Sequence, residues 1–506
     1  MDLGHTTRND IYGKTRRFLF LIFLLPCMAN SLREIDNDFW FILNHGRYVL
    51  EHGFPTIEPF SIHAGLSFVM QQWLTAVIFQ LIYTALGTVG IKLLVFVCYV
   101  ISISVFYKLC MRLSRNFFFL SYLLTIAFSL LISFFMVERP FVLMTLILLV
   151  EIYALEAYAE NADKNNARRL IIALPILSIL LVSIQASMWL MLFVLLLPYV
   201  IGSFRFKIGA VYGETLPKKP IVITVVLMAA AGFVNPYGGD AMTYLLRSYG
   251  VDEINSLVAE MYPTTVTSGL GMIMFGMIVV IFLAFVLYRN DRMPVRYVLL
   301  VLGTAYLGLS SYRGFIFFII CGIFPLAAHY RDFKIPELSG NSSPRTLKIR
   351  KILIALVGCA LICLVIAGGS QYKNLASTPG NSELLNAAVA VVKQDQEQGN
   401  VILYTGYNDG NLAEYNGIRA YLDTRAEVFI KNNNHKEDIL KEYYELQTGR
   451  LHYKTFLEKY HFTHLILNKN STELLRTYVA HDPEYVMIYA NDSYEVYRLK
   501  AYKGGI

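Results

Sequence analysis

The sequence has few charged residues. Only 16% of its 506 residues carry a charge, against about 25% for an ordinary soluble domain, and the mean hydropathy is +0.48. This shortage excludes a wholly soluble protein and indicates that lipid solvates much of the chain. The net charge of +7 resides in the gaps between apolar runs, so we attribute it to membrane topology and expect no nucleic-acid partner.

Cysteine is also scarce, and the polar C-terminal part has none. The six cysteines all lie in or beside apolar segments: Cys27, Cys98, Cys110, Cys321, Cys359 and Cys363. A disulfide framework in the C-terminal part is therefore excluded.

Apolar runs near the ~20 residues that cross a bilayer recur from Arg17 to about Gly369. They predict a polytopic α-helical membrane protein with about eleven transmembrane helices, near 17–31, 89–107, 117–136, 141–157, 170–184, 187–201, 220–234, 268–288, 297–312, 314–330 and 351–369. The pair on either side of Gln185 could also be one long tilted helix. The first run follows Lys14 and Arg16 without a small-residue cleavage site, so we expect an uncleaved anchor.

Charge in the gaps predicts the topology. Lysine and arginine cluster in 8–17, 108–115, 164–169, 205–219, 289–296 and 331–351, which we place in the cytoplasm. The gaps 31–66 and 235–267 and the turn at Glu138 are poorer in bases and should lie outside. If 68–86 spanned the membrane, the bases at 108–115 would fall outside, so we expect an interfacial helix there.

These assignments divide the chain into four parts. Residues 1–16 are a cytoplasmic N-terminus, and 17–369 are the transmembrane domain, with an external loop over 32–88 that carries interfacial helices. A linker over 370–380 leads to an extracytoplasmic α/β domain over 381–506. In that domain we expect strands at 401–404, 419–422, 464–467, 485–489 and 495–499 and helices at 382–398, 436–447, 452–460 and 471–480. The segment Asn408-Asp409-Gly410 has turn chemistry.

Three acids follow the first apolar run within five residues: Glu34, Asp36 and Asp38. An uncompensated charged side chain at a membrane costs free energy. Asp36 and Asp38 could simply cap the helix expected from Phe39. They could equally take a proton from an acceptor or orient a metal ion, and the residues alone leave these two interpretations nearly even.

Other ionisable residues fall on the same predicted outer face. Glu138-Arg139-Pro140 forms a hairpin turn, Asp240 ends the turn from Asn235, Glu260 closes the same loop, and Arg313 separates two apolar runs. Each has a structural alternative: a local ion pair for Glu138 and Arg139, solvated acids for Asp240 and Glu260, and a snorkelling arginine for Arg313. Their convergence from separate hairpins favours a functional pocket.

Several motifs resemble those of bacterial GT-C glycosyltransferases, which use polyprenyl-phosphate-linked sugars. They also resemble, more distantly, oligosaccharyltransferases, protein O-mannosyltransferases and lipid A aminoarabinose transferases. The motifs are Asp36-Asn37-Asp38-Phe39-Trp40, Asn44-His45-Gly46-Arg47-Tyr48, Glu51-His52-Gly53-Phe54-Pro55, Gln72-Trp73-Leu74, Arg139-Pro140, Asn235-Pro236-Tyr237-Gly238, Tyr407-Asn408-Asp409-Gly410-Asn411-Leu412 and Leu422-Asp423-Thr424-Arg425.

The resemblance implies roles for particular residues. Asp38 would be the catalytic base or metal-orienting group, assisted by Asp36 and Glu138, and Arg313 would hold the donor phosphate. The substrate-binding candidates are Arg313, Arg139, His45, Gln185, Glu260 and Asp240. A divalent cation, Mg²⁺ or Mn²⁺, could be held by Asp38 and Glu138. Gln185 stands where relatives often have an ionisable residue, so it could bond a sugar without carrying a proton.

The function expected from this resemblance is an inverting glycosyltransferase. It would transfer a hexosyl or pentosyl group from a polyprenyl-phosphate donor to an unknown glycan, lipid or protein acceptor on the outer face of the cell membrane. The alternatives are a transporter or translocase of lipid-linked glycans and a non-catalytic family member. Charges at the ends of the spans and the lack of an internal repeat argue against a transporter.

Overall fold

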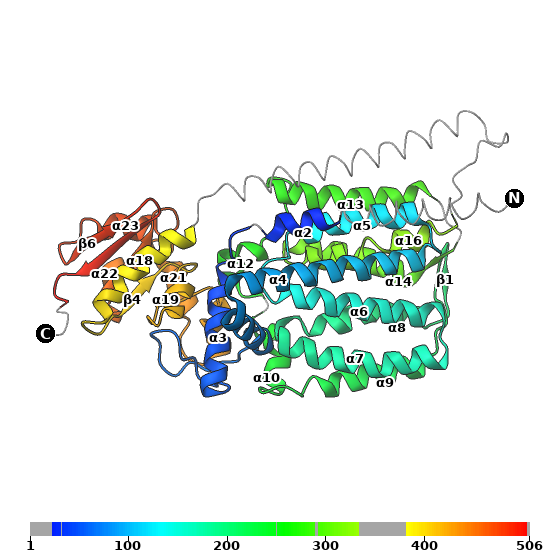
Figure 1. Cartoon of the computed structure of the whole chain (residues 1–506), viewed down its shortest axis with the longest axis horizontal. Helices are drawn as coiled ribbons and strands as arrows, with labels where there is room; N and C mark the ends of the chain where they lie inside the picture. Colours follow the sequence, from blue (N-terminus) through cyan, green and yellow to red (C-terminus); the bar gives the residue numbers. More distant parts are fainter. Residues whose placement is uncertain (1–22, 32, 249, 289–291, 333–380, 503–506) are drawn as a thin grey trace, which may run out of the picture.

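A computed structural model gives the architecture of the chain and describes residues 23–31, 33–248, 250–288, 292–332 and 381–502. It shows an elongated helical bundle with an α/β domain at one end (Figure 1). The bundle consists of α2 (Leu24–Ser31), α4 (Trp73–Leu113), α5 (Phe118–Ile132), α6 (Phe141–Glu160), α7 (Lys164–Ile184), α8 (Leu190–Gly202), α9 (Lys218–Ala231), α13 (Gly269–Leu287), α14 (Val295–Ser310), α15 (Phe315–Cys321) and α16 (Pro325–His329).

Three of these helices, α4, α6 and α7, are long and apolar enough to cross a membrane, and shorter apolar helices cover 118–132, 186–202, 271–287, 295–310 and 315–329. The spans predicted between residues 89 and 312 each coincide with a helix of the bundle or with part of one, and the span predicted at 314–330 is divided into α15 and α16. The predicted count of eleven stays a prediction, because 351–369 and the start of 17–31 lie outside the described residues.

The bundle exposes apolar side chains at helical spacing. Examples are Leu93, Val97 and Ile101 on α4, Ile172, Ile176 and Leu180 on α7, and Leu302, Tyr306 and Leu309 on α14. Apolar stripes of this kind exceed the apolar patches found on the surfaces of soluble proteins, and they are typical of lipid-facing helices. The interior is also apolar: the rings of Phe106 and Phe128 stack with centres 4.0 Å apart.

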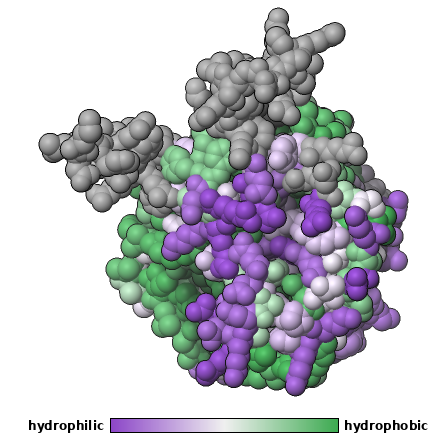
Figure 2. Space-filling view, turned by 90° about the vertical axis from the view of Figure 1, so that its right-hand side faces the viewer, coloured by the Kyte–Doolittle hydropathy of each residue, from purple (hydrophilic) through white to green (hydrophobic). Residues whose placement is uncertain are grey.

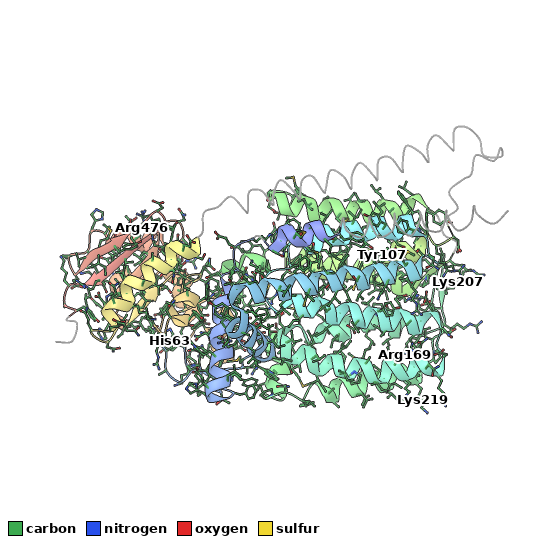
Figure 3. The ribbon with its side chains drawn as sticks, in the orientation of Figure 1. His63, Tyr107, Arg169, Lys207, Lys219 and Arg476 are labelled. Carbon is green, nitrogen blue, oxygen red and sulfur yellow. The ribbon has the colours of Figure 1, made fainter. Side chains whose placement is uncertain are left out.

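The end of the bundle far from the α/β domain is polar. Figure 2 looks onto this end and shows hydrophilic residues across it, with apolar residues along its flanks. Arg169, Lys207 and Lys219 lie there (Figure 3). A small sheet of β1 (Lys207–Ile208), β2 (Val211–Tyr212) and β3 (Met293–Pro294) joins two of its loops. The predicted cytoplasmic gaps over 164–169 and 205–219 therefore meet at one end.

Two breaks in the apolar runs shape the opposite end. At Gly87 the backbone adopts φ 60° and ψ −152°, which interrupts α4 in a region open to glycine. The part before Gly87 packs through Ala76 and Phe79 against α3 (Asp38–His52). At Gln185, α7 ends, and the short η1 (Ala186–Met188) leads into α8. The alternative of one long helix through Gln185 is therefore wrong.

The C-terminal domain is an α/β unit, as predicted. Its sheet has the order β4-β5-β7-β6, with β4 (Leu403–Thr405) parallel to β5 (His464–Asn468) and the pairs with β7 (Tyr494–Leu499) and β6 (Tyr485–Ala490) antiparallel. The helices are α18 (Asn381–Gln396), α19 (Gly410–Tyr415), α20 (Lys431–Asn434), α21 (Ile439–Gln447), α22 (Tyr453–Tyr460) and α23 (Glu473–Val479).

One local prediction in this domain is wrong. Residues 419–422 form only an isolated parallel bridge, between Ala420 and Leu403. The chain then turns at once into a buried ion-pair cluster around Arg425 instead of extending a strand. The turn predicted at 408–410 is present over 407–409, where the Asp409 N–H donates to Gly406 O at 3.0 Å, and α19 begins directly after it.

The α/β domain docks on the loops at one end of the bundle. Leu66 and Phe68 of the loop between α3 and α4 share a hydrophobic core with Phe429 of the domain, and Ile254 of α12 (Asp252–Leu257) joins them. Backbone bonds cross the boundary too, including Ile62 N to Ala420 O at 3.0 Å. These loops and the domain therefore form one packed unit around the start of α3.

Candidate active site

Arg139 brings together acids from two distant loops. It stands just before α6, and its side chain is 21% exposed. Its Nε donates to Asp36 Oδ1 at 2.8 Å, and its Nη2 lies 3.1 Å from Asp38 Oδ2. Its Nη1 pairs with Glu260, which belongs to the short helix η2 (Ala259–Met261). One guanidinium thus joins the segment between α2 and α3 to the loop before α13.

The neighbouring Glu138 binds the backbone of Asp36. It is only 3% exposed, and its Oε2 accepts a bond from the backbone N–H of Asp36 at 3.2 Å. Its other oxygen lies 2.6 Å from Nζ of Lys92, which belongs to α4 beyond the break at Gly87. The two partners neutralise each other where a lone buried charge would be costly.

Asp38 also contacts the C-terminal domain. Its Oδ1 accepts a hydrogen bond from Thr424 Oγ1 at 2.6 Å, and Asn411 Nδ2 lies 3.5 Å away. Its backbone N–H donates to Asp36 Oδ1 at 3.0 Å. The carboxylate is therefore held on one side by Arg139 and on the other by the α/β domain.

The surroundings of Asp38 change its proton affinity. Burial raises its pKa to about 6; the neighbouring carboxylates of Asp36 and Glu260 add to this, while Arg139 and the Thr424 hydroxyl act against it. Burial alone would lower the pKa of Arg139, but the three acids raise it well above its usual value, so the guanidinium stays charged. A carboxyl whose pKa is near neutrality, in a fixed position, is suited to accept a proton.

Arg313 contacts the same network through its backbone N–H. Its N–H donates to the carbonyl oxygen of Glu260 at 3.0 Å, and its guanidinium carbon lies 5.0 Å from the centre of the Phe141 ring. Its Nε is buried and has no hydrogen-bond partner among the residues that the structure describes. Such a group can donate to an anion that enters the site.

His45 takes part in a second, fully buried cluster. Its Nε2 lies 3.2 Å from Nη1 of Arg425. That guanidinium also donates to Asp423 at 2.7 Å, lies 3.1 Å from Glu58 of the loop between α3 and α4 and donates to Glu414 at 3.0 Å. Burial and Arg425 lower the pKa of His45 well below its usual value, so the ring is neutral. His45 thus lies 2% exposed in the domain junction.

Two other predicted substrate-binding residues lie apart from these clusters. Gln185 is 3% exposed between α7 and η1, and the following N–H, of Ala186, bonds the carbonyl oxygen of Gln71 at 2.8 Å. Asp240 is exposed and lies 3.3 Å from Arg247. The structure thus joins Asp36, Asp38, Glu138, Arg139, Glu260 and Arg313 in one network and leaves His45, Gln185 and Asp240 outside it.

Three residues that contact the network were not among the predicted site residues. Lys92 carried a signal, since a lone lysine near the end of an apolar span usually has a partner. Asn411 and Thr424 lie in two of the motifs that resemble GT-C proteins, but the motifs assign no role to either side chain. Only the docking of the domain brings them to Asp38.

The predicted metal ligands do not form a cation site in this arrangement. Asp38 is bound by Arg139 and Thr424, and Glu138 by Lys92 and the Asp36 N–H. Within the described ranges, no three histidine, cysteine, aspartate or glutamate side chains are grouped so that they could hold a metal ion. The acids here are matched by protein cations instead.

A groove opens between α3 and the α/β domain. Its volume is about 330 Å³, and it is lined by Asn44, Arg47, Tyr48, Glu51, Pro59, Phe60, Glu414, Gly417, Ile418 and Arg419. The α3 residues recur every three or four positions, so they share one face of the helix that begins at Asp38. The groove combines aromatic rings with planar polar groups.

Comparison with known proteins places the fold. No protein-family model and no curated protein matches the sequence. Among solved structures, ArnT from Cupriavidus metallidurans matches 96% of this chain and 98% of its own, with a TM-score of 0.53 and 11% identity. The chain has the GT-C fold.

Other GT-C structures agree. The oligosaccharyltransferase AglB from Archaeoglobus fulgidus, in complex with an inhibitory peptide and a dolichol-phosphate, matches 92% of this chain and 71% of its own, with a TM-score of 0.59 and 11% identity. The arabinofuranosyltransferase AftD from Mycobacteria matches 96% of this chain but only 40% of its own, with a TM-score of 0.51 and 13% identity. The resemblance to GT-C proteins expected from the motifs is thus confirmed at the level of the fold.

Proposed function

We propose that this protein is a membrane glycosyltransferase. It transfers a hexosyl or pentosyl group from a polyprenyl-phosphate-linked donor to a hydroxyl group of an acceptor, with inversion at the anomeric carbon. The observation that carries this proposal is the network around Arg139 in a GT-C fold: the guanidinium pairs with Asp38 and Glu260, and the backbone N–H of Arg313 donates to Glu260. ArnT has been solved with undecaprenyl phosphate and AglB with dolichol-phosphate, which supports the donor class.

The chemistry assigns a role to each side chain. Asp38 accepts the proton of the acceptor hydroxyl, whose oxygen forms a bond to the anomeric carbon as the bond from that carbon to the phosphate oxygen breaks. The polyprenyl phosphate departs with the electron pair, and Arg313 stabilises its developing charge. A single displacement of this kind inverts the configuration.

The remaining residues hold this arrangement. Asp36 and Glu260 fix the guanidinium of Arg139, and Glu138 fixes the backbone of Asp36. We derive no step through a divalent cation, because Asp38 and Glu138 are already paired with protein groups. A structure of the A. fulgidus enzyme contains zinc and sulfate, so transfer should be measured with and without added divalent cations.

We place the active end on the non-cytoplasmic side of the cell membrane. Arg169, Lys207 and Lys219 gather at the opposite end of the bundle (Figures 2 and 3). Basic loops stay in the cytoplasm, which puts the α/β domain outside.

The groove along α3 is the proposed approach of the acceptor. Its aromatic and planar polar lining suits a sugar or another polar chain. Asn44 lies six residues from Asp38, which is about 9 Å along a helix. An acceptor that reaches from the groove to Asp38 therefore needs to be extended over at least that distance.

The direct test is transfer by the purified protein. We would place it in nanodiscs with radiolabelled undecaprenyl-phosphate sugars, both hexosyl and pentosyl, and membranes of the source cells as acceptor, with and without Mg²⁺ or Mn²⁺. Label should move from the lipid to the acceptor with release of undecaprenyl phosphate. Movement of intact labelled lipid across proteoliposomes without cleavage would instead identify a translocase and reject the proposal.

A further inference from the structure

Two loops of the C-terminal domain close over Asn37 and Asp38. In the first, which leads into α19, the carbonyl oxygen of Asn408 accepts a bond from Asn37 Nδ2, and Asn411 Nδ2 in the first turn of α19 lies 3.3 Å from the carbonyl oxygen of Asn37. From the second, Thr424 Oγ1 donates to Asp38 Oδ1 at 2.6 Å. Residues almost 400 positions apart thus meet at one carboxylate.

The bonds around Thr424 have a direction. A hydroxyl group has one proton to donate, and Asn411 Nδ2 donates to the same oxygen from 2.9 Å. The amide therefore occupies an acceptor position of Oγ1, and the hydroxyl proton points to Asp38, which is its shortest and charged acceptor. Hydrogen bonds to a charged group are the stronger kind.

The position of Thr424 is itself fixed. Its carbonyl oxygen accepts a bond from the hydroxyl of Tyr407 at 2.8 Å. The next residue, Arg425, is 4% exposed and lies 3.1 Å from Glu58 of the first external loop. Nearby, His63 Nε2 lies 2.7 Å from the carbonyl oxygen of Tyr421, at the junction marked in Figure 3. These contacts fix the backbone that carries Thr424 beside Asp38.

We propose that the C-terminal domain completes the active site, with Thr424 and Asn411 as positioning residues for Asp38. This inference rests on the proposed function and extends it, because it gives the domain a part in the transfer step. Arg139 holds Oδ2 of Asp38 from the membrane side, and Thr424 holds Oδ1 from the domain side. The carboxylate plane is then fixed before the acceptor arrives, and this preorganisation aids proton transfer.

The first experiment measures the contact without any substrate. We would compare the thermal unfolding of the full-length protein with Thr424→Val, Asp38→Ala and both changes, at pH 8. If the bond exists, Thr424→Val lowers Tm in the wild-type background and lowers it much less when Asp38 is already alanine. Equal losses in the two backgrounds would overturn the inference. Thr448→Val, which removes an exposed hydroxyl of the same domain, is the matched control.

The second experiment measures positioning through the pH profile of transfer. The hydroxyl favours the ionised form of Asp38, so its loss should move the acidic limb of kcat/KM upward by about one pH unit or more. Thr424→Ser keeps the hydroxyl and should keep the wild-type limb, while Asn411→Leu should move it in the same direction as Thr424→Val. A purely structural role would lower activity without moving the limb and would reject the inference.

The experiments can reject the role of the C-terminal domain without rejecting the proposed function. If Asp38→Asn abolishes transfer but Thr424→Val keeps the wild-type rate and pH profile, the domain does not position Asp38, although the proposed function stands. If Asp38→Asn transfers normally, the proposed function is rejected, and the inference with it.

Discussion

Replacing Arg139 by lysine tests the network at its centre. The guanidinium contacts three acids through three different nitrogens, with Nε bound to Asp36, Nη2 to Asp38 and Nη1 to Glu260. A lysine keeps the positive charge, but its single ammonium cannot reproduce this fork. At least one charge-assisted contact should therefore be lost.

The size of the effect follows from the cost of such a contact. Hydrogen bonds to charged groups contribute about 1.5–3 kcal/mol, and about 1.4 kcal/mol corresponds to a tenfold change in rate. Loss of one contact that orients Asp38 should lower kcat/KM by about 10–100-fold. Arg139→Met removes the charge as well and should lower kcat/KM further.

The assay is the initial rate of label transfer at saturating acceptor and varied donor. Arg476→Lys is the matched control, because Arg476 forms one ion pair with Glu495, at 3.2 Å, in the α/β domain away from the site (Figure 3). Its activity should equal that of the wild-type protein. Wild-type kcat/KM for Arg139→Lys would show that the three-way contact is not needed and would refute the reasoning.

Three further predictions concern charge. Burial raises the pKa of Asp38 from 3.8 to about 6. Between about pH 4 and 6 the folded protein therefore holds this proton while the unfolded chain releases it, so the contribution of Asp38 to stability falls as the pH rises through that window. We expect Asp38→Asn to raise Tm more at pH 8 than at pH 4.5. Arg425→Met strands several carboxylates in the junction and should lower the free energy of unfolding by about 3–5 kcal/mol, which thermal unfolding and faster proteolysis of the C-terminal domain would reveal. Arg313→Ala should lower kcat and kcat/KM for the lipid-linked donor. Arg419→Ala should raise KM for the acceptor, and the opposite pattern would contradict the two assignments.

The transmembrane part was largely predictable, because lipid imposes a simple pattern. A helix in a bilayer needs a long apolar run, so the runs between residues 89 and 330 give the helices directly. The charge argument that separated 68–86 from the following span is matched by the break at Gly87. The α/β domain was less predictable: residues 419–422 have strand-forming side chains, but the buried partners of Arg425 draw the chain away from the sheet.

The candidate active site was predictable in part. Acids and arginines beside a membrane are costly, so Asp38, Glu138, Arg139 and Arg313 stood out before their contacts were known. Their partners depend on tertiary docking, which the sequence does not reveal. The part that Thr424 has in the site follows only from the docking of the domain, which brings its hydroxyl to 2.6 Å from Asp38.

The most direct test of the account is the turnover of a single labelled donor by Asp38→Asn, with Asp252→Asn as the control. Asp252 is an exposed acid in the segment between α9 and α13 that also carries Glu260. We predict that Asp38→Asn folds and inserts into the membrane but transfers label at less than about 1% of the wild-type rate, while Asp252→Asn transfers at the wild-type rate. Near-normal transfer by Asp38→Asn would contradict the account.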